Sequence, residues 1–133
     1  MPLITITLRD TTPPAERRAI ADGIHQAIAG AGFPAADRFQ RILALPADQL
    51  IYDPRHPDLT TPRSERFVLV EILLSVGRSV EFKRDLLAAL VANLQRDPGL
   101  DPHDVMVVFV ETARENWAFA SGIQTYVASE PKQ

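Results

Sequence analysis

The stretch Leu3–Leu8, which reads LITITL, decides how the fold begins. Its apolar residues alternate with threonine, which is the period of a β-strand with one buried face. The next segment predicts a helix, since Thr11 or Thr12 can cap it and Pro13–Pro14 can occupy its first turn. Apolar residues then recur on one face until Gly30 ends the pattern.

The second half of the chain repeats this order. Phe67–Leu74 is almost entirely apolar, which suits a central strand covered on both faces. Ser79 is a suitable N-cap for a second helix, whose leucine-rich stripe continues until Asp97, Pro98 and Gly99. Val105–Val110 is the last predicted strand.

The segments that link these elements are less regular. Phe39–Leu45 alternates imperfectly and is a weaker strand candidate that Pro46 ends. Residues 46–63 form a long loop rich in proline and aspartate, and a loop of this length often lies over a functional site. The loop is therefore a candidate lid. The segment after Val110, which holds Trp117, Phe119 and Tyr126, predicts a short hairpin or an arm.

The order of the elements predicts an α+β (α/β-like) fold over residues 1–133 as a single domain. Two consecutive βαβ units of similar size would form a four-stranded mixed sheet, with parallel strands inside each unit and both helices on one face. The other face of the sheet then needs a cover. Association of subunits is the simplest one, so we expect an oligomer.

Composition limits the partners of the chain. A formal charge of -3 provides no basic field for nucleic acid, and the absence of cysteine excludes thiolate chemistry. No apolar run approaches the roughly 20 residues that span a bilayer, and the first residues lack the pattern of a signal peptide. We expect a cytoplasmic protein without membrane contact.

Pro2 is the most informative position for chemistry. Initiator methionine is readily removed before proline, which leaves a secondary amine at the chain end. An α-amino group titrates near about 7.7 to 8.0, and burial beside cations favours its neutral form. Such an amine can remove a proton from a carbon next to a carbonyl group. Taken alone, a proline at this position is more simply a processing signal.

A resemblance to a known protein family supports a catalytic role for Pro2. Pro2–Leu3 at the start of a strand, the segment Phe33–Gln40 (FPAADRFQ) and the segment Asn116–Phe119 (NWAF) resemble, in this order, the tautomerase superfamily. The malonate semialdehyde decarboxylase group within it is most similar. The resemblance covers essentially the whole chain. It implies a tautomerase/MIF-type fold, a catalytic N-terminal proline, a homotrimer and no cofactor.

The resemblance also implies a second catalytic residue. The family's aspartate falls on Asp37, with Phe39 in place of a tyrosine. A carboxylate beside the proline amine could orient it, favour its protonated form or position water. Aspartate also commonly caps a turn, which is the alternative for Asp37.

Arg78 is the third catalytic candidate. The decarboxylase group carries two arginines between its third strand and second helix; Arg78 matches the second of them, and Val76 replaces the first. Arg78 could hold a substrate carboxylate at the helix start, although a solvated arginine is the commoner case. Loss of the partner arginine weakens the case for decarboxylation and leaves tautomerisation possible.

Three other residues are candidates for binding the substrate. Arg38 could add positive charge near Asp37, whereas on a strand it would more often face solvent. Trp117 and Phe119 match a Trp-Ser-Phe pattern of the family, with Ala118 in place of the serine. They could wall an apolar pocket or pack at a subunit interface. The three histidines are scattered, so we expect no metal site.

Three functions remain open at this point. The first is a proline-based tautomerase that acts on a small 2-oxo or enol carboxylate. The second is a decarboxylase or hydratase of a β-keto or unsaturated carboxylate, in which protonated Pro2 acts as an acid. The third is a non-catalytic ligand-binding module on the same fold.

Overall fold

The computed structural model of the chain describes residues 1–128. Its principal elements are, in order, β1 (Leu3–Arg9), α1 (Pro14–Gly30), β2 (Phe39–Leu45), β3 (Val68–Ser75), α2 (Val80–Arg96) and β4 (Val105–Thr112). These six elements have the predicted types and order, and their ends agree within two residues. Residues 129–133 of the predicted domain lie outside the described part.

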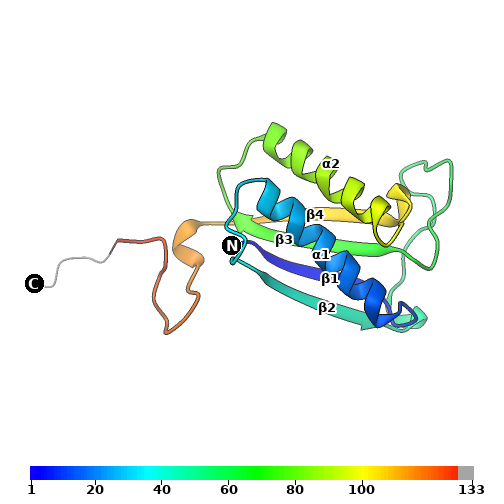
Figure 1. Cartoon of the computed structure of the whole chain (residues 1–133), viewed down its shortest axis with the longest axis horizontal. Helices are drawn as coiled ribbons and strands as arrows, with labels where there is room; N and C mark the ends of the chain where they lie inside the picture. Colours follow the sequence, from blue (N-terminus) through cyan, green and yellow to red (C-terminus); the bar gives the residue numbers. More distant parts are fainter. Residues whose placement is uncertain (129–133) are drawn as a thin grey trace, which may run out of the picture.

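The four strands form one mixed sheet in the order β2-β1-β3-β4. β1 is parallel to β2, β3 is parallel to β4, and the two pairs meet through antiparallel β1 and β3. Both helices lie on the same face of this sheet (Figure 1). The predicted pair of βαβ units is therefore confirmed, including the central position of β3.

The core lies between the helices and the sheet. Ile6 of β1 and Ile72 of β3 face Ile24 of α1 and Leu90 of α2, and all four side chains are fully buried. Burying each such side chain contributes about 1.5 to 3 kcal/mol. The helices approach closely at Gly23, because a Cβ atom there would lie 3.0 Å from Leu94 Cδ2.

The two halves of the chain contain the same elements in the same order, and corresponding helices and edge strands are separated by the same number of residues. α2 (80–96) begins and ends 66 residues after α1 (14–30), and β4 begins at 105, 66 residues after β2 at 39. Because β1 and β3 are antiparallel, the halves are related by an approximate twofold axis through the sheet. The strands and helices of one half thus have counterparts in the other half.

The predicted cap of α1 is wrong, whereas that of α2 is confirmed. Neither Thr11 nor Thr12 caps α1; Pro13 is the N-cap residue and provides no side-chain bond. Arg17 instead reaches back, and its Nε donates to the Thr12 carbonyl at 2.8 Å. In α2, the Ser79 hydroxyl accepts a hydrogen bond from the Phe82 N–H at 3.0 Å.

The segment after β4 is an arm and not a hairpin, because no strand occurs between residues 113 and 128. It consists of the 3₁₀ turn Arg114–Asn116 and further turns, held by a 3.0 Å hydrogen bond from Thr125 N–H to the Trp117 carbonyl. Figure 1 shows that the arm leaves the sheet at the end where β1 begins. It is thus placed beside the N-terminus.

The sheet face opposite the helices is only partly covered. Apolar side chains on it stay 38–47% exposed, namely Phe39, Leu43, Met106, Val108 and Val110. In β3 the residues on this face are half-buried, so the described chain does not supply the expected cover on both faces. Among the described residues, no helix is both long and apolar enough to cross a membrane.

Candidate active site at the N-terminus

The start of β1 is buried, with Met1 still attached to Pro2. Both residues are buried, and the Met1 side chain lies against β3, where the Ser75 hydroxyl donates to its sulfur at 2.7 Å. The Met1 amino group forms an ion pair with the Asp37 carboxylate. The chain end is therefore held between Asp37 and Ser75, and the Pro2 nitrogen follows one residue later.

Asp37 is presented by the turn between α1 and β2. Its N–H donates to the Pro34 carbonyl at 3.0 Å, so Asp37 also lies in a turn, which was the alternative interpretation of this residue. Oδ2 accepts from the Met1 amine, whereas Oδ1 is buried without a hydrogen-bond partner. A buried carboxylate oxygen without a partner is costly, which favours a donor at this position.

An apolar pocket of about 420 Å³ opens beside this end of β1. It is lined by Leu3, Phe39, Leu73, Thr112, Asn116, Trp117, Ala118 and Phe119. Trp117 is 9% exposed, and its indole Nε1 is buried without a partner. The structure thus brings both predicted aromatic residues to one pocket, with a free hydrogen-bond donor in its wall.

Aromatic rings connect this pocket to the arm. Phe119 stacks on Phe39 with ring centroids 5.5 Å apart, and Tyr126 meets Phe119 edge-on at 5.8 Å. Burial raises the pKa of the Tyr126 phenol above its usual value, the Asp37 carboxylate adds to the rise, and Arg114 opposes it. Tyr126 is therefore a neutral hydroxyl near Asp37 at physiological pH.

Sequence reasoning did not identify Ser75 or Tyr126 as site residues. Ser75 ends a strand and Tyr126 lies in an irregular segment, so neither stands in a recognisable motif. Ser75 contacts Met1, and Tyr126 contacts Phe119. Both contacts depend on how the chain packs at the start of β1, and the sequence pattern contains no signal for this packing.

Arg78 lies near this end of the sheet and outside the lining of the pocket. Its guanidinium carbon is 4.6 Å from the ring centroid of Phe33 and 4.8 Å from that of Phe82, and the residue is exposed. These are cation–π contacts. Val76, at the position of the family's other arginine, is tied to β4 by a 3.0 Å hydrogen bond from its N–H to the Thr112 carbonyl.

Arg38, a predicted substrate-binding residue, does not line this pocket and contacts α1. Its Nη2 contacts Asp22 Oδ1 of α1 at 2.6 Å, and its Nε donates to Gln40 at 2.9 Å. The Arg38 hydrogen bond holds the pKa of Asp22 below its usual value. Arg38 therefore joins α1 to the start of β2.

The loop 46–63 does not cover this site within the chain. It begins after β2 and precedes β3, and Figure 1 shows it at the opposite end of the sheet from the N-terminus. The candidate lid lies away from this site because parallel β1 and β2 both end at the far edge, so a loop after β2 starts there.

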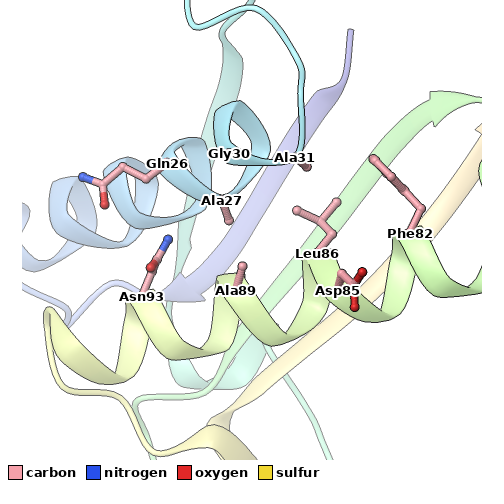
Figure 2. A pocket seen from close by; sticks show the side chains of 9 residues that line it. All are labelled: Gln26, Ala27, Gly30, Ala31, Phe82, Asp85, Leu86, Ala89 and Asn93. Atoms are coloured by element: carbon pink, nitrogen blue, oxygen red, sulfur yellow. The ribbon is translucent and has the colours of Figure 1, made fainter.

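A groove of about 550 Å³ lies between the helices (Figure 2). Figure 2 shows Gln26 and Asn93 at one end and Phe82 at the other, with Ala27 and Ala89 between them. Asp85 is its one ionisable lining residue. A single exposed carboxylate without an acid or base partner gives no basis for catalysis, so we place the candidate site at the N-terminus.

Comparison with known proteins assigns the chain to a class. A family model described as tautomerase enzyme matches residues 37–120, and no curated protein sequence matches significantly. The chain belongs to this tautomerase family. The site at the head of β1 is thus the candidate active site of a tautomerase-family protein.

Several solved structures are similar to this chain over most of its length. FG41 malonate semialdehyde decarboxylase, inhibited by 3-bromopropiolate, is 32% identical over 93% of both chains, with a TM-score of 0.87. A second malonate semialdehyde decarboxylase, described with decarboxylase and hydratase activities, is 29% identical over 92% of this chain and 93% of its own, with a TM-score of 0.85. A fused 4-OT, solved as a symmetric trimer, is 24% identical over 91% of this chain and 94% of its own, with a TM-score of 0.73, and shares the fold.

Proposed function

We propose that this chain is a cofactor-independent tautomerase of small 2-oxo or enol carboxylates, with the Pro2 amine as general base after removal of Met1. The observation that carries the proposal is the Asp37 carboxylate bound to the amino group at the buried head of β1. Consecutive Cα atoms are about 3.8 Å apart, so the amine uncovered at Pro2 would start close to the same carboxylate.

Removal of Met1 would also make room for a substrate. Met1 is only 6% exposed, and its side chain contacts Ser75. Without it, the space beside Pro2 would be bounded by Asp37 and Ser75 and would adjoin the apolar end of β1. A small carboxylate could then occupy a site that has both polar groups and desolvating walls.

The proposed reaction moves one proton. The neutral Pro2 nitrogen takes it from the enol hydroxyl or from the carbon next to the carbonyl, and the ammonium returns it to the other atom. Asp37 orients the amine, and Trp117 and Phe119 exclude water from the reacting carbon. We propose Arg78, which is exposed and three residues after Ser75, as the cation for the substrate carboxylate.

A decarboxylase or hydratase is the second candidate, and the same ion pair favours it. A carboxylate beside an amine stabilises the ammonium form, which could protonate a product carbanion or polarise a carbonyl group. The 32% identity to a malonate semialdehyde decarboxylase supports this alternative. Val76, which carries no charge where that group has an arginine, favours the tautomerase.

The two candidates predict opposite pH profiles and different substrates. For a base, kcat/KM on phenylenolpyruvate should rise with pH as the amine loses its proton; for an acid, kcat/KM on malonate semialdehyde should fall over the same range. We expect the rising profile and a clear preference for the enol, measured on protein shown by mass spectrometry to lack Met1. A falling profile with preference for malonate semialdehyde would favour the decarboxylase instead.

A further inference from the structure

A second pocket, of about 530 Å³, lies at the opposite end of the sheet, where β1 ends and β3 begins. Its lining includes Arg9 at the end of β1, Leu50, Ile51 and Tyr52 in the loop after β2, and Arg63 and Glu65 before β3. It shares no residue with the pocket beside Pro2.

The internal repeat makes this pocket the counterpart of the proposed active site. A shift of 66 residues places Leu50, Ile51 and Tyr52 at the positions of Asn116, Trp117 and Ala118, which line the pocket beside Pro2. Both pockets thus use the short segment that follows the edge strand of a βαβ unit. The same shift places Val68 at the position of Pro2.

Val68 lies inside the chain, so its nitrogen is an amide without a basic lone pair. The second pocket therefore lacks the group proposed for catalysis. It has two arginines instead, whereas no arginine lines the pocket beside Pro2. The repeat has kept a cavity at this end, where two arginines and the carboxylate of Glu65 replace the base.

Both arginines have donors that the protein leaves unused. Arg9 Nε and Arg63 Nε are buried without a hydrogen-bond partner. Arg63 Nη1 donates to the Asp53 carbonyl at 2.9 Å, which fixes its position without neutralising its charge. Within residues 1–128, neither arginine forms an ion pair with a carboxylate.

Aromatic rings hold the two guanidinium groups in place. The Arg9 guanidinium carbon lies 5.9 Å from the Tyr52 ring centroid, and that of Arg63 lies 5.9 Å from the Phe67 ring centroid. Tyr52 and Phe67 stack on each other at 4.2 Å. The donors are thus preorganised, which lowers the entropic cost of binding an anion.

We propose that this pocket binds a small organic carboxylate without converting it. The carboxylate would pair with the guanidinium groups of Arg9 and Arg63, and its apolar body would contact Leu50, Ile51 and Tyr52. The site is separate from the proposed catalysis, so it holds even if Pro2 is not a base.

Benzoate is a suitable probe, and each pocket has its own reporter. The Nε–H NMR signals of Arg9 and Arg63 report on the second pocket, and the fluorescence of Trp117, the one tryptophan, reports on the first. We expect benzoate to shift both arginine signals with one common saturation curve. Inorganic phosphate should shift them more weakly, because it cannot use the apolar wall.

Substitutions in the second pocket should change ligand binding there and leave binding in the pocket beside Pro2 unchanged. Arg9→Met should raise the benzoate concentration that half-saturates the Arg63 signal by about 10-fold to 100-fold, and Arg63→Met should do the same for the Arg9 signal. The Trp117 titration should stay unchanged in both. Arg84→Met, which removes an exposed arginine from α2, is the matched control and should leave both titrations unchanged.

Three results would overturn the proposal. The arginine signals could fail to respond to benzoate, or they could respond equally to phosphate, which would show a site that recognises charge alone. A crystal structure could place a carboxylate of a second copy of the chain on Arg9 and Arg63. In that case the two donors serve an interface and no small ligand.

Discussion

Asp37 is the residue on which the candidate site depends most. One of its carboxylate oxygens holds the amino group at the chain end, and the other is buried without a partner. The Trp117 Nε1 is a second unpartnered buried group in the same region. A substrate with a carbonyl or carboxylate oxygen could accept from the indole, and a hydroxyl or a water could donate to Asp37.

We expect Asp37→Asn to lower kcat/KM by about 10-fold to 100-fold, because a charge-assisted hydrogen bond to the Pro2 amine is lost. It should also move the rising limb of the pH profile to lower pH, since the neighbouring carboxylate no longer favours the ammonium form. Asp85→Asn, in the groove between the helices, is the control and should leave both quantities unchanged. An identical pH profile in Asp37→Asn would show that the carboxylate does not contact the catalytic amine.

Single residues differ in how well the sequence indicates their position. Asp37, Trp117 and Phe119 stand in recognisable short motifs and do reach one end of the sheet. Arg38 adjoins Asp37 in the same motif and still pairs with Asp22 of α1. A long side chain has several partners within reach, and the sequence pattern does not rank them. Only the packed structure decides between them.

At the scale of elements, the turn between β3 and α2 carries Arg78, the cation proposed for the substrate carboxylate. Arg78 rests on the rings of Phe33 and Phe82, and Val76 offers no charge. A cation stacked on two rings keeps its hydrogen-bond donors free at the ring edges. The turn can therefore present one guanidinium to a substrate while the aromatic contacts restrain it.

Substitutions in this turn separate binding from stability. Arg78→Ala should raise KM strongly, with kcat/KM falling by about 10-fold to 100-fold, and lower stability by about 0.5 to 1 kcal/mol through the lost cation–π contacts. Val76→Arg should improve decarboxylation relative to tautomerisation, because a second cation fixes the carboxylate. Arg84→Ala in α2 is the control. If Arg78→Ala loses only stability, the carboxylate is bound elsewhere.

The elements themselves were predictable because each has a strong local signal. Alternation marked β1, a capped leucine stripe marked α2, and an apolar run marked β3. The position of the candidate lid was not predictable from its length, because loop length carries no information on which end of a sheet a loop occupies. The strand directions contain that information: β1 and β2 run the same way, so 46–63 begins at the far edge.

At the scale of the whole molecule, the sheet face opposite the helices is only partly covered by the described chain. Apolar side chains from β2 and β4 stay exposed on it, among them Leu43, Met106 and Val110. Exposed apolar surface of this extent on one face is typical of an interface. The trimer that the family resemblance of the sequence implies stays a prediction, and this exposed face supports it.

Light scattering at micromolar concentration should therefore give about three times the subunit mass of 14.7 kDa. Val108→Glu, in the middle of the exposed stripe of β4, should shift the mass toward the monomer, because burying its charge at an apolar interface is costly. Val127→Glu, which is also exposed but lies on the arm, is the matched control and should keep the trimer. A monomer mass for the unaltered protein would refute the trimer.

The role of the chain end is the central claim, and removal of Met1 tests it most directly. Two samples of the unaltered sequence should be prepared, one fully processed and one with Met1 retained by inhibiting methionine aminopeptidase during expression, with mass spectrometry to verify both. The processed protein should convert phenylenolpyruvate. The protein with Met1 should lose at least about 100-fold in kcat/KM, because the Pro2 nitrogen is then an amide without a basic lone pair. Equal activity in the two samples would contradict the proline mechanism.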